Sequence, residues 1–383
     1  MHAFLAALAL LFAAELKNGE IVDGVTCAAE PAISYAYYLP ANYTPRQTWP
    51  VVFVFDPRKR GARAAEFFRE PAEKYGWIVV SSNNTESDTD AQPSIHAIQT
   101  MLPDAQQRFS IDTKRIYVAG FSGTAIIAWA LADVTKSISG VFGCSGRPLP
   151  DPRYNVSFAW FGTAGSVDFN NMETRELDRG LDAAHATHRM ELFDGPHRWA
   201  PPELIARGFE WFELLAMKNG SRPKDETFIA QQFADQIERA GKEQDLLVAA
   251  RQYESIVRTF DGLVNVDAAR ERAKSIKASR EFAKAQRAEK HADDLERSYR
   301  QRTSQILSEF LQSDAPEVVS GLAHALQVPQ LLQLATKPTY EGLAAQRVLE
   351  GMHAQLAFYR VPDATGSKLA VMKQVAAMIR PKS

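Results

Sequence analysis

Short hydrophobic runs alternate with helix-length stretches along the chain up to residue 217. Runs rich in Val, Ile, Phe and Tyr and bounded by turn residues are typical of β-strands. The predicted strands are 35–39, 50–55, 77–80, 115–119, 138–142, 158–161 and 189–193, and the predicted helices are 62–75, 92–107, 123–133, 172–186 and 202–217. This alternation predicts an α/β fold with a mostly parallel sheet flanked by helices, in which the loops after the strands share one edge.

The pattern changes at residues 219–224, where Asn-Gly-Ser-Arg-Pro-Lys is typical of a linker. Beyond it, apolar residues recur at helical spacing and no strand pattern is present. We therefore predict an α/β domain over 27–219, followed by an all-α helical domain over 220–383. Residues 249–260, with the helix from Thr227 before them, resemble one tetratricopeptide repeat, and a generic helical bundle is the alternative. The charged stretch 270–302 is typical of a solvated helix face.

The N-terminus carries an apolar run of twelve residues, AFLAALALLFAA at 3–14. A membrane-spanning helix needs about 20 such residues, so the run is too short to cross a bilayer. It predicts a signal peptide over residues 1–15, although no Lys or Arg precedes it, and a buried N-terminal helix is the alternative. The mature chain is then expected to be periplasmic or secreted, without stable membrane insertion.

Net charge, cysteine positions and motif spacing limit the ligands and partners that the sequence predicts. The formal net charge is −2, so the chain has no general attraction to nucleic acid. Neither Cys27 nor Cys144 lies in a CxxC pair, and both a disulfide and two buried thiols remain open. Because no His, Asp or Glu group shows metal-ligand spacing and no glycine-rich nucleotide loop is present, we expect neither a metal nor a cofactor.

The segment 115–129 carries the clearest chemical signal. A predicted strand leads directly into Gly120-Phe121-Ser122-Gly123-Thr124, and a helix follows. Strand, sharp turn and helix form the context in which a GxSxG-like motif indicates a nucleophilic serine. The turn is expected to hold Ser122 in a strained conformation at a helix N-terminus, where backbone N–H groups favour developing negative charge.

A serine hydroxyl needs a base to take its proton and a carboxylate to orient that base. In chain order, the acid and then the histidine should follow the serine. Asp168 follows the strand at 158–161 and His197 follows the strand at 189–193, which predicts the triad Ser122, Asp168 and His197. Two other carboxylates compete for the orienting role: Asp194 and Glu173. Three further histidines are interpreted as surface or packing residues: His96, His185 and His188.

Three segments together resemble the α/β-hydrolase superfamily: 120–123, 162–168 and 195–199. The similarity covers about residues 33–217, and within the superfamily it points to secreted esterases of the polyhydroxyalkanoate-depolymerase and feruloyl-esterase kind. It implies hydrolysis of a small or polymeric carboxylic ester, or less readily of an amide or peptide. Ser122 would be the nucleophile that carries the acyl group, His197 the general base and then acid, and Asp168 the orienting carboxylate.

The chain departs from the family pattern at two places. Thr124 stands where the motif has its second glycine, and Asp56-Pro57 replaces the usual His-Gly. By loop position, the two oxyanion-hole donors would be the N–H groups of Gly123 and Arg58, since proline cannot donate. These departures favour the alternative of a catalytically inactive scaffold protein whose helical domain binds a protein partner.

Overall fold

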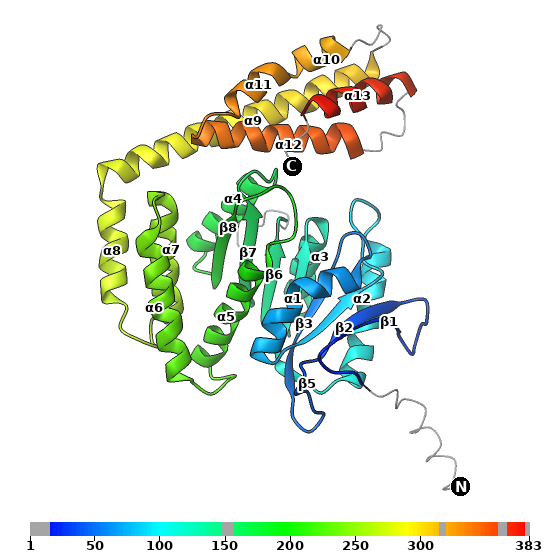
Figure 1. Cartoon of the computed structure of the whole chain (residues 1–383), viewed down its shortest axis with the longest axis vertical. Helices are drawn as coiled ribbons and strands as arrows, with labels where there is room; N and C mark the ends of the chain where they lie inside the picture. Colours follow the sequence, from blue (N-terminus) through cyan, green and yellow to red (C-terminus); the bar gives the residue numbers. More distant parts are fainter. Residues whose placement is uncertain (1–15, 147–155, 314–318, 359–365, 380–383) are drawn as a thin grey trace. The chain divides into compact units, whose positions relative to one another are not determined.

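The computed structural model describes residues 16–146, 156–313, 319–358 and 366–379. The predicted signal peptide at 1–15 lies outside the described residues. Strands are interspersed with helices as far as α5, and among the described residues every element named after α5 is a helix, as Figure 1 shows. The structure thereby confirms the predicted α/β part followed by an all-α part.

Eight strands form one sheet in the order β1-β2-β4-β3-β5-β6-β7-β8. They are β1 (Ile21–Thr26), β2 (Ser34–Tyr38), β3 (Trp49–Phe55), β4 (Ile78–Ser82), β5 (Ile111–Phe121), β6 (Gly140–Cys144), β7 (Ala159–Gly165) and β8 (His188–Phe193). The β1–β2 and β2–β4 pairs are antiparallel, whereas β3 is parallel to both β4 and β5. The helices between the strands are α1 (Gly61–Tyr75), α2 (Gln92–Arg108), α3 (Gly123–Thr135) and α4 (Asn171–Ala183), and α5 (Pro202–Lys218) follows β8.

Strand β3 is buried along its whole length, as its continuous apolar sequence predicts. It runs parallel to β5 with Phe55 opposite Gly120, so both strands end together. Trp77, just before β4, stacks on Tyr117 of β5 with ring centroids 4.3 Å apart. The parallel register of β3 and β5 places the loop after β3 and the turn after β5 at one edge of the sheet.

Strand β1 was not predicted from the sequence. It pairs with β2 through an irregular register, and its residues are partly or fully exposed. Gly24 within it has a positive φ of 70° and interrupts any alternation of apolar and polar residues. An edge strand of this kind has too little buried surface to leave a hydrophobic pattern.

The helical part comprises α6 (Glu226–Lys242), α7 (Leu246–Phe260), α8 (Asp267–Lys277), α9 (Arg280–Gln312), α10 (Val319–Ala325), α11 (Val328–Leu334), α12 (Tyr340–Phe358) and α13 (Gly366–Ile379). Asp225, Asp245 and Ser279 cap the N-termini of α6, α7 and α9 with side-chain hydrogen bonds. Residues of α6, α7 and α8 share an apolar cluster with Leu214 and Met217 of α5. The tetratricopeptide-like interpretation of 249–260 stays a prediction.

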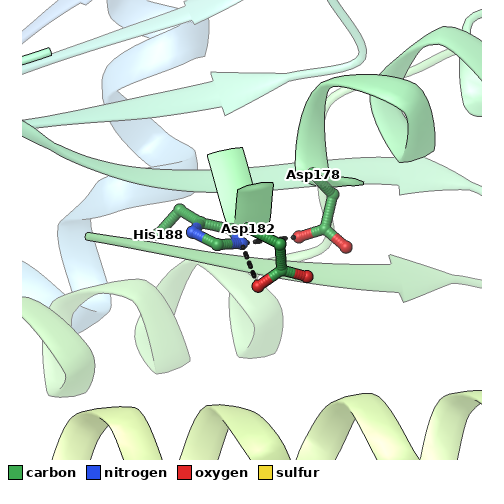
Figure 2. A group of neighbouring side chains, drawn as sticks. All are labelled: Asp178, Asp182 and His188. Atoms are coloured by element: carbon green, nitrogen blue, oxygen red, sulfur yellow. Dashed lines mark ion pairs between the residues drawn. The ribbon is translucent and has the colours of Figure 1, made fainter. Parts of the chain in front are cut away.

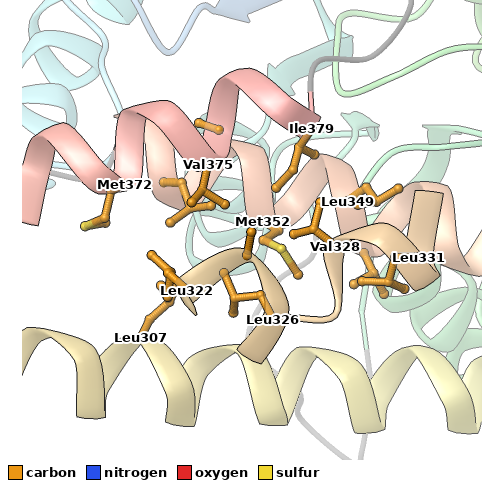
Figure 3. Close-up of a cluster of buried hydrophobic side chains, with 14 of the residues drawn as sticks. Leu307, Leu322, Leu326, Val328, Leu331, Leu349, Met352, Met372, Val375 and Ile379 are labelled. Atoms are coloured by element: carbon orange, nitrogen blue, oxygen red, sulfur yellow. The ribbon is translucent and has the colours of Figure 1, made fainter. Parts of the chain in front are cut away.

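A second apolar cluster unites α9 to α13. Figure 3 shows Leu307 of α9 next to Leu322 of α10, in a cluster that also holds Val328 of α11, Met352 of α12 and Val375 of α13. Apolar contacts from five helices give this bundle its own core. No helix among the described residues is long and apolar enough to cross a membrane.

The described chain divides into two compact units. One holds most residues up to Gly143 together with Val156–Trp160 and Pro201–Phe209, and the other holds Phe161–Ala200 and the chain from Glu210 onward. The predicted domain boundary at 219–220 stays a prediction.

Of the two cysteine alternatives, the structure shows free, buried thiols at Cys27 and Cys144, and burial raises the pKa of each to about 11.

Candidate active site

Ser122 occupies a single-residue turn between β5 and α3. Its backbone has φ 57° and ψ −129°, a region that residues other than glycine rarely adopt. Such strain costs about 1–3 kcal/mol, and it persists where the surrounding structure fixes it. The partly exposed serine therefore stands at the N-terminus of α3 in a conformation that the chain maintains at an energetic cost.

The two glycines of the serine turn are required by close contacts with neighbouring atoms. A Cβ atom at position 120 would lie 2.3 Å from the carbonyl oxygen of Thr124. One at position 123 would lie 2.5 Å from Cβ of Ser87, in the polar loop before α2. Any side chain at either position would push the turn out of place.

Thr124 fits its position through hydrogen bonds. Its fully buried hydroxyl donates to the carbonyl of Phe55 at 2.6 Å and accepts from the N–H of Phe121 at 3.1 Å. The hydroxyl thus ties the end of β3 to the serine turn. The departure from a second glycine is therefore compatible with a well-held turn.

The two predicted oxyanion donors differ in availability. Gly123 begins α3, and the N–H of a first helical residue has no acceptor within its helix. The N–H of Arg58, by contrast, donates to Oδ1 of the buried Asp56 at 2.9 Å, and the Arg60 guanidinium binds the same carboxylate. Arg58 is therefore not available as the second donor in this conformation, whereas Gly123 stays a prediction.

Asp168 and His197 form a hydrogen-bonded pair in the second unit. His197 Nδ1 lies 2.9 Å from Oδ1 of the fully buried Asp168, which also accepts from the N–H of Asn170 at 2.7 Å. The carboxylate assigns the proton to Nδ1, so Nε2 carries the lone pair that a general base needs. The ring of Phe169 lies against the imidazole, with centroids 4.2 Å apart.

A close approach of two loops brings this pair together. A Cβ atom on Gly165, at the end of β7, would lie 2.2 Å from the carbonyl oxygen of Gly195 in the loop after β8. Val167 N–H donates to that carbonyl at 3.1 Å, and Ser166 N–H donates to Phe193 O at 2.7 Å. Backbone contacts therefore fix the spacing of the two loops.

The competing carboxylates have other partners. Asp194 accepts a hydrogen bond from Ser166 Oγ at 3.0 Å. Glu173 forms an ion pair with Arg300. Asp168 is the carboxylate that the structure places on the imidazole. Ser122 belongs to one compact unit and the Asp168–His197 pair to the other, so the triad as a whole stays a prediction.

Sequence reasoning missed Glu350 of α12. Its Oε1 accepts a hydrogen bond from the backbone N–H of His197 at 2.6 Å, across 153 residues of sequence. Burial, together with the charge of Asp168, raises the pKa of Glu350 to about 7. No local motif marks a glutamate on a distant helix, so only the fold reveals this contact.

Asp178, Asp182 and His188 form a second polar cluster, shown in Figure 2. The carboxylates lie one turn apart on α4, and His188 Nε2 faces them from β8 at 3.3 and 3.4 Å. Imidazole and carboxylate groups are common metal ligands, and the sequence spacing had given no sign of this grouping. Here the groups pair with one another, and the Arg258 guanidinium donates to Asp182 at 2.8 Å. We interpret the cluster as an ion-pair network between α4 and β8.

The charge of His188 is expected to make stability depend on alkaline pH. Burial alone would lower the pKa of His188, but the two carboxylates outweigh it and raise the pKa from 6.5 to about 9. The resulting stabilisation, on the order of 3 kcal/mol, is complete below pH 6.5 and is lost as pH rises through 9. Urea unfolding between pH 6 and 10 should show this loss, and His188→Gln should flatten the profile in that interval.

The neighbouring His185 provides the matched control. It has a positive φ of 54°, so His185→Asn keeps a residue that tolerates this conformation. This variant should retain the wild-type pH profile. A wild-type free energy of unfolding that stays constant from pH 6 to 10 would contradict a charged His188.

Solved structures similar to this chain include esterases and serine hydrolases. A ferulic acid esterase is 15% identical with a TM-score of 0.41, and the match covers 50% of this chain and 95% of that one. The substrate-bound fluorophosphonate-binding serine hydrolase F of Staphylococcus aureus is 11% identical with a TM-score of 0.42, covering 51% and 98%. A truncated carbohydrate esterase from gut microbiota is 14% identical with a TM-score of 0.43, covering 55% and 99%. No family model and no curated protein matches the chain.

Proposed function

We propose that this chain is a serine hydrolase that cleaves a carboxylic ester through an acyl-enzyme on Ser122. The observation that carries the proposal is the Asp168–His197 pair, whose geometry leaves Nε2 of the imidazole as a base. The strained turn after β5, which carries Ser122, supplies the proposed nucleophile. Strain and a buried carboxylate both cost stability, and a purely structural protein gains nothing from either.

In the proposed reaction, His197 Nε2 takes the proton of Ser122 as the hydroxyl oxygen attacks the ester carbonyl. The N–H of Gly123, at the positive end of α3, stabilises the negative charge that develops on the carbonyl oxygen. The imidazolium then protonates the leaving alcohol, and the acyl group remains on the serine. Water, deprotonated by the same imidazole, releases the acid and restores the hydroxyl. Asp168 holds the imidazole in its tautomer throughout.

A fluorophosphonate probe tests this proposal directly on the full chain. A nucleophilic Ser122 displaces fluoride from the probe, so the protein should gain one adduct, which peptide mass spectrometry should locate on Ser122. Short-chain p-nitrophenyl esters should be hydrolysed with the same pH dependence as labelling. A chain that neither labels nor hydrolyses these esters would favour the scaffold alternative, in which the helical part binds a partner.

The apolar run at 3–14 supports a second proposal, namely that the chain is exported to the periplasm or secreted. N-terminal sequencing of the protein recovered from cells should then begin after the predicted leader. Recovery of the uncleaved N-terminus from the cytoplasm alone would contradict export.

A further inference from the structure

The helical part of the chain contacts the backbone on both sides of the acid–base pair. Glu350 of α12 accepts from the N–H of His197 itself. Arg347, one turn earlier, donates to the carbonyl of Ser166 at 3.2 Å, two residues before Asp168. Arg300 of α9 donates to the carbonyl of Phe169, the residue after it. Three side chains that lie far from the motif in sequence therefore hold the two loops of the pair.

Ion pairs with buried carboxylates hold the arginine side chains in place. Arg347 Nε lies 2.7 Å from Oε2 of Glu296, whose side chain is fully buried, and Arg300 pairs with the same carboxylate. Arg175 of α4, only 5% exposed, binds Asp293 of α9 through two nitrogens. Because bidentate, buried ion pairs restrict side-chain geometry, α9 is fixed against the helix that follows the acid loop.

Packing supports the same arrangement at α12. A Cβ atom on Gly351 would lie 3.2 Å from Cβ of Phe169, whose ring in turn lies against the imidazole of His197. The helix therefore reaches the back of the imidazole through an aromatic side chain as well as through Glu350. Displacement of α12 would loosen both contacts at once.

We propose that Glu350 is a positioning residue of the hydrolase, which fixes His197 through the backbone N–H of the histidine. This inference rests on the proposed function, because positioning matters only if His197 acts as a base. A hydrogen bond to the backbone of the base limits its movement relative to the nucleophile, and small displacements of catalytic groups reduce rates steeply.

The carboxyl group of Glu350 has a charged environment. Asp168 and His197 face it from the two loops, Arg347 lies one turn earlier on α12, and Glu296 lies beyond that arginine. Burial of the group and the charge of Asp168 raise the pKa of Glu350 to about 7. The side chain thus changes from acid to carboxylate near neutral pH, and the carboxylate form favours the imidazolium that develops during the reaction.

Two substitutions separate the hydrogen bond from the charge. Glu350→Ala removes the acceptor, and we expect kcat for a p-nitrophenyl ester to fall by up to about 100-fold with little change in KM. Glu350→Gln keeps an acceptor oxygen but cannot ionise. At about pH 6, where the wild-type group is protonated, glutamine should restore most of kcat, and above about pH 8 the wild type should exceed it several-fold. Glu341→Gln, at the other end of α12, is the matched control and should behave as wild type.

The outcomes distinguish this inference from the proposed function. If the wild type neither labels with fluorophosphonate nor hydrolyses esters, both fail together. If the wild type is active and Glu350→Ala keeps its kcat within twofold, the positioning role alone is overturned. The same holds if the ratio of wild-type to Glu350→Gln rates is constant with pH. Because Glu350→Gln retains the size and the acceptor, it supplies this test even if the alanine variant does not fold.

Discussion

Replacing Ser122 by alanine is expected to abolish fluorophosphonate labelling and to lower kcat for p-nitrophenyl esters by about 10⁶-fold, because the nucleophile is lost. Alanine leaves the imidazole and the carboxylate in place, but no hydroxyl remains to receive the acyl group. The fold should stay intact, because alanine can adopt the same backbone conformation at φ 57°. Labelling, ester hydrolysis and melting temperature measured together check all three points.

Ser137, an exposed residue shortly after α3, provides the matched control for this experiment. Ser137→Ala should label and turn over esters as the wild type does. Full labelling of Ser122→Ala would place the reactive nucleophile elsewhere in the chain. That result would refute the role of the turn after β5.

Replacing Asp168 by asparagine is expected to lower kcat by about 10⁴-fold while the fold stays intact. The amide donates a hydrogen bond to Nδ1 of His197 and thereby moves the ring proton to Nε2. The nitrogen that should accept the serine proton is then already protonated. Steady-state kinetics with circular dichroism as a check of folding measures this effect.

Asp194→Asn is the informative comparison for Asp168→Asn. The structure places Asp194 on the hydroxyl of Ser166, so its loss should change kcat only a few-fold. If Asp168→Asn kept the wild-type rate while Asp194→Asn lost activity, the orienting carboxylate would be Asp194. Asp194 could reach the imidazole only if the loops after β7 and β8 adopted another arrangement in solution.

Much of the fold follows from hydrophobic patterning. The run at 50–55 predicted β3 because a strand buried on both faces needs apolar residues at successive positions. The sequence at 123–133 predicted α3, which the structure extends to Thr135. Strand β1 was missed by the sequence prediction because its pairing relies on backbone hydrogen bonds at the sheet edge and little on buried side chains.

The candidate site was predictable where chemistry follows chain order. Asp168 and His197 were expected after successive strands, and the structure joins them. The choice of Asp168 over Asp194 needed loop geometry, since each of these residues lies in a loop after a predicted strand. The engagement of the Arg58 N–H and the contact of Glu350 depend on turns and helix packing that leave no periodic trace.

The hydroxyl of Thr124 has a consequence for how turns of this kind are recognised in sequences. A β-branched residue is accommodated beside the serine because the neighbouring strand offers a carbonyl within reach, so bonding replaces empty space. Sequence screens that demand a small residue at this place discard chains in which a side-chain hydrogen bond holds the serine turn. A better criterion is whether the adjacent strand supplies a partner for the side chain found there.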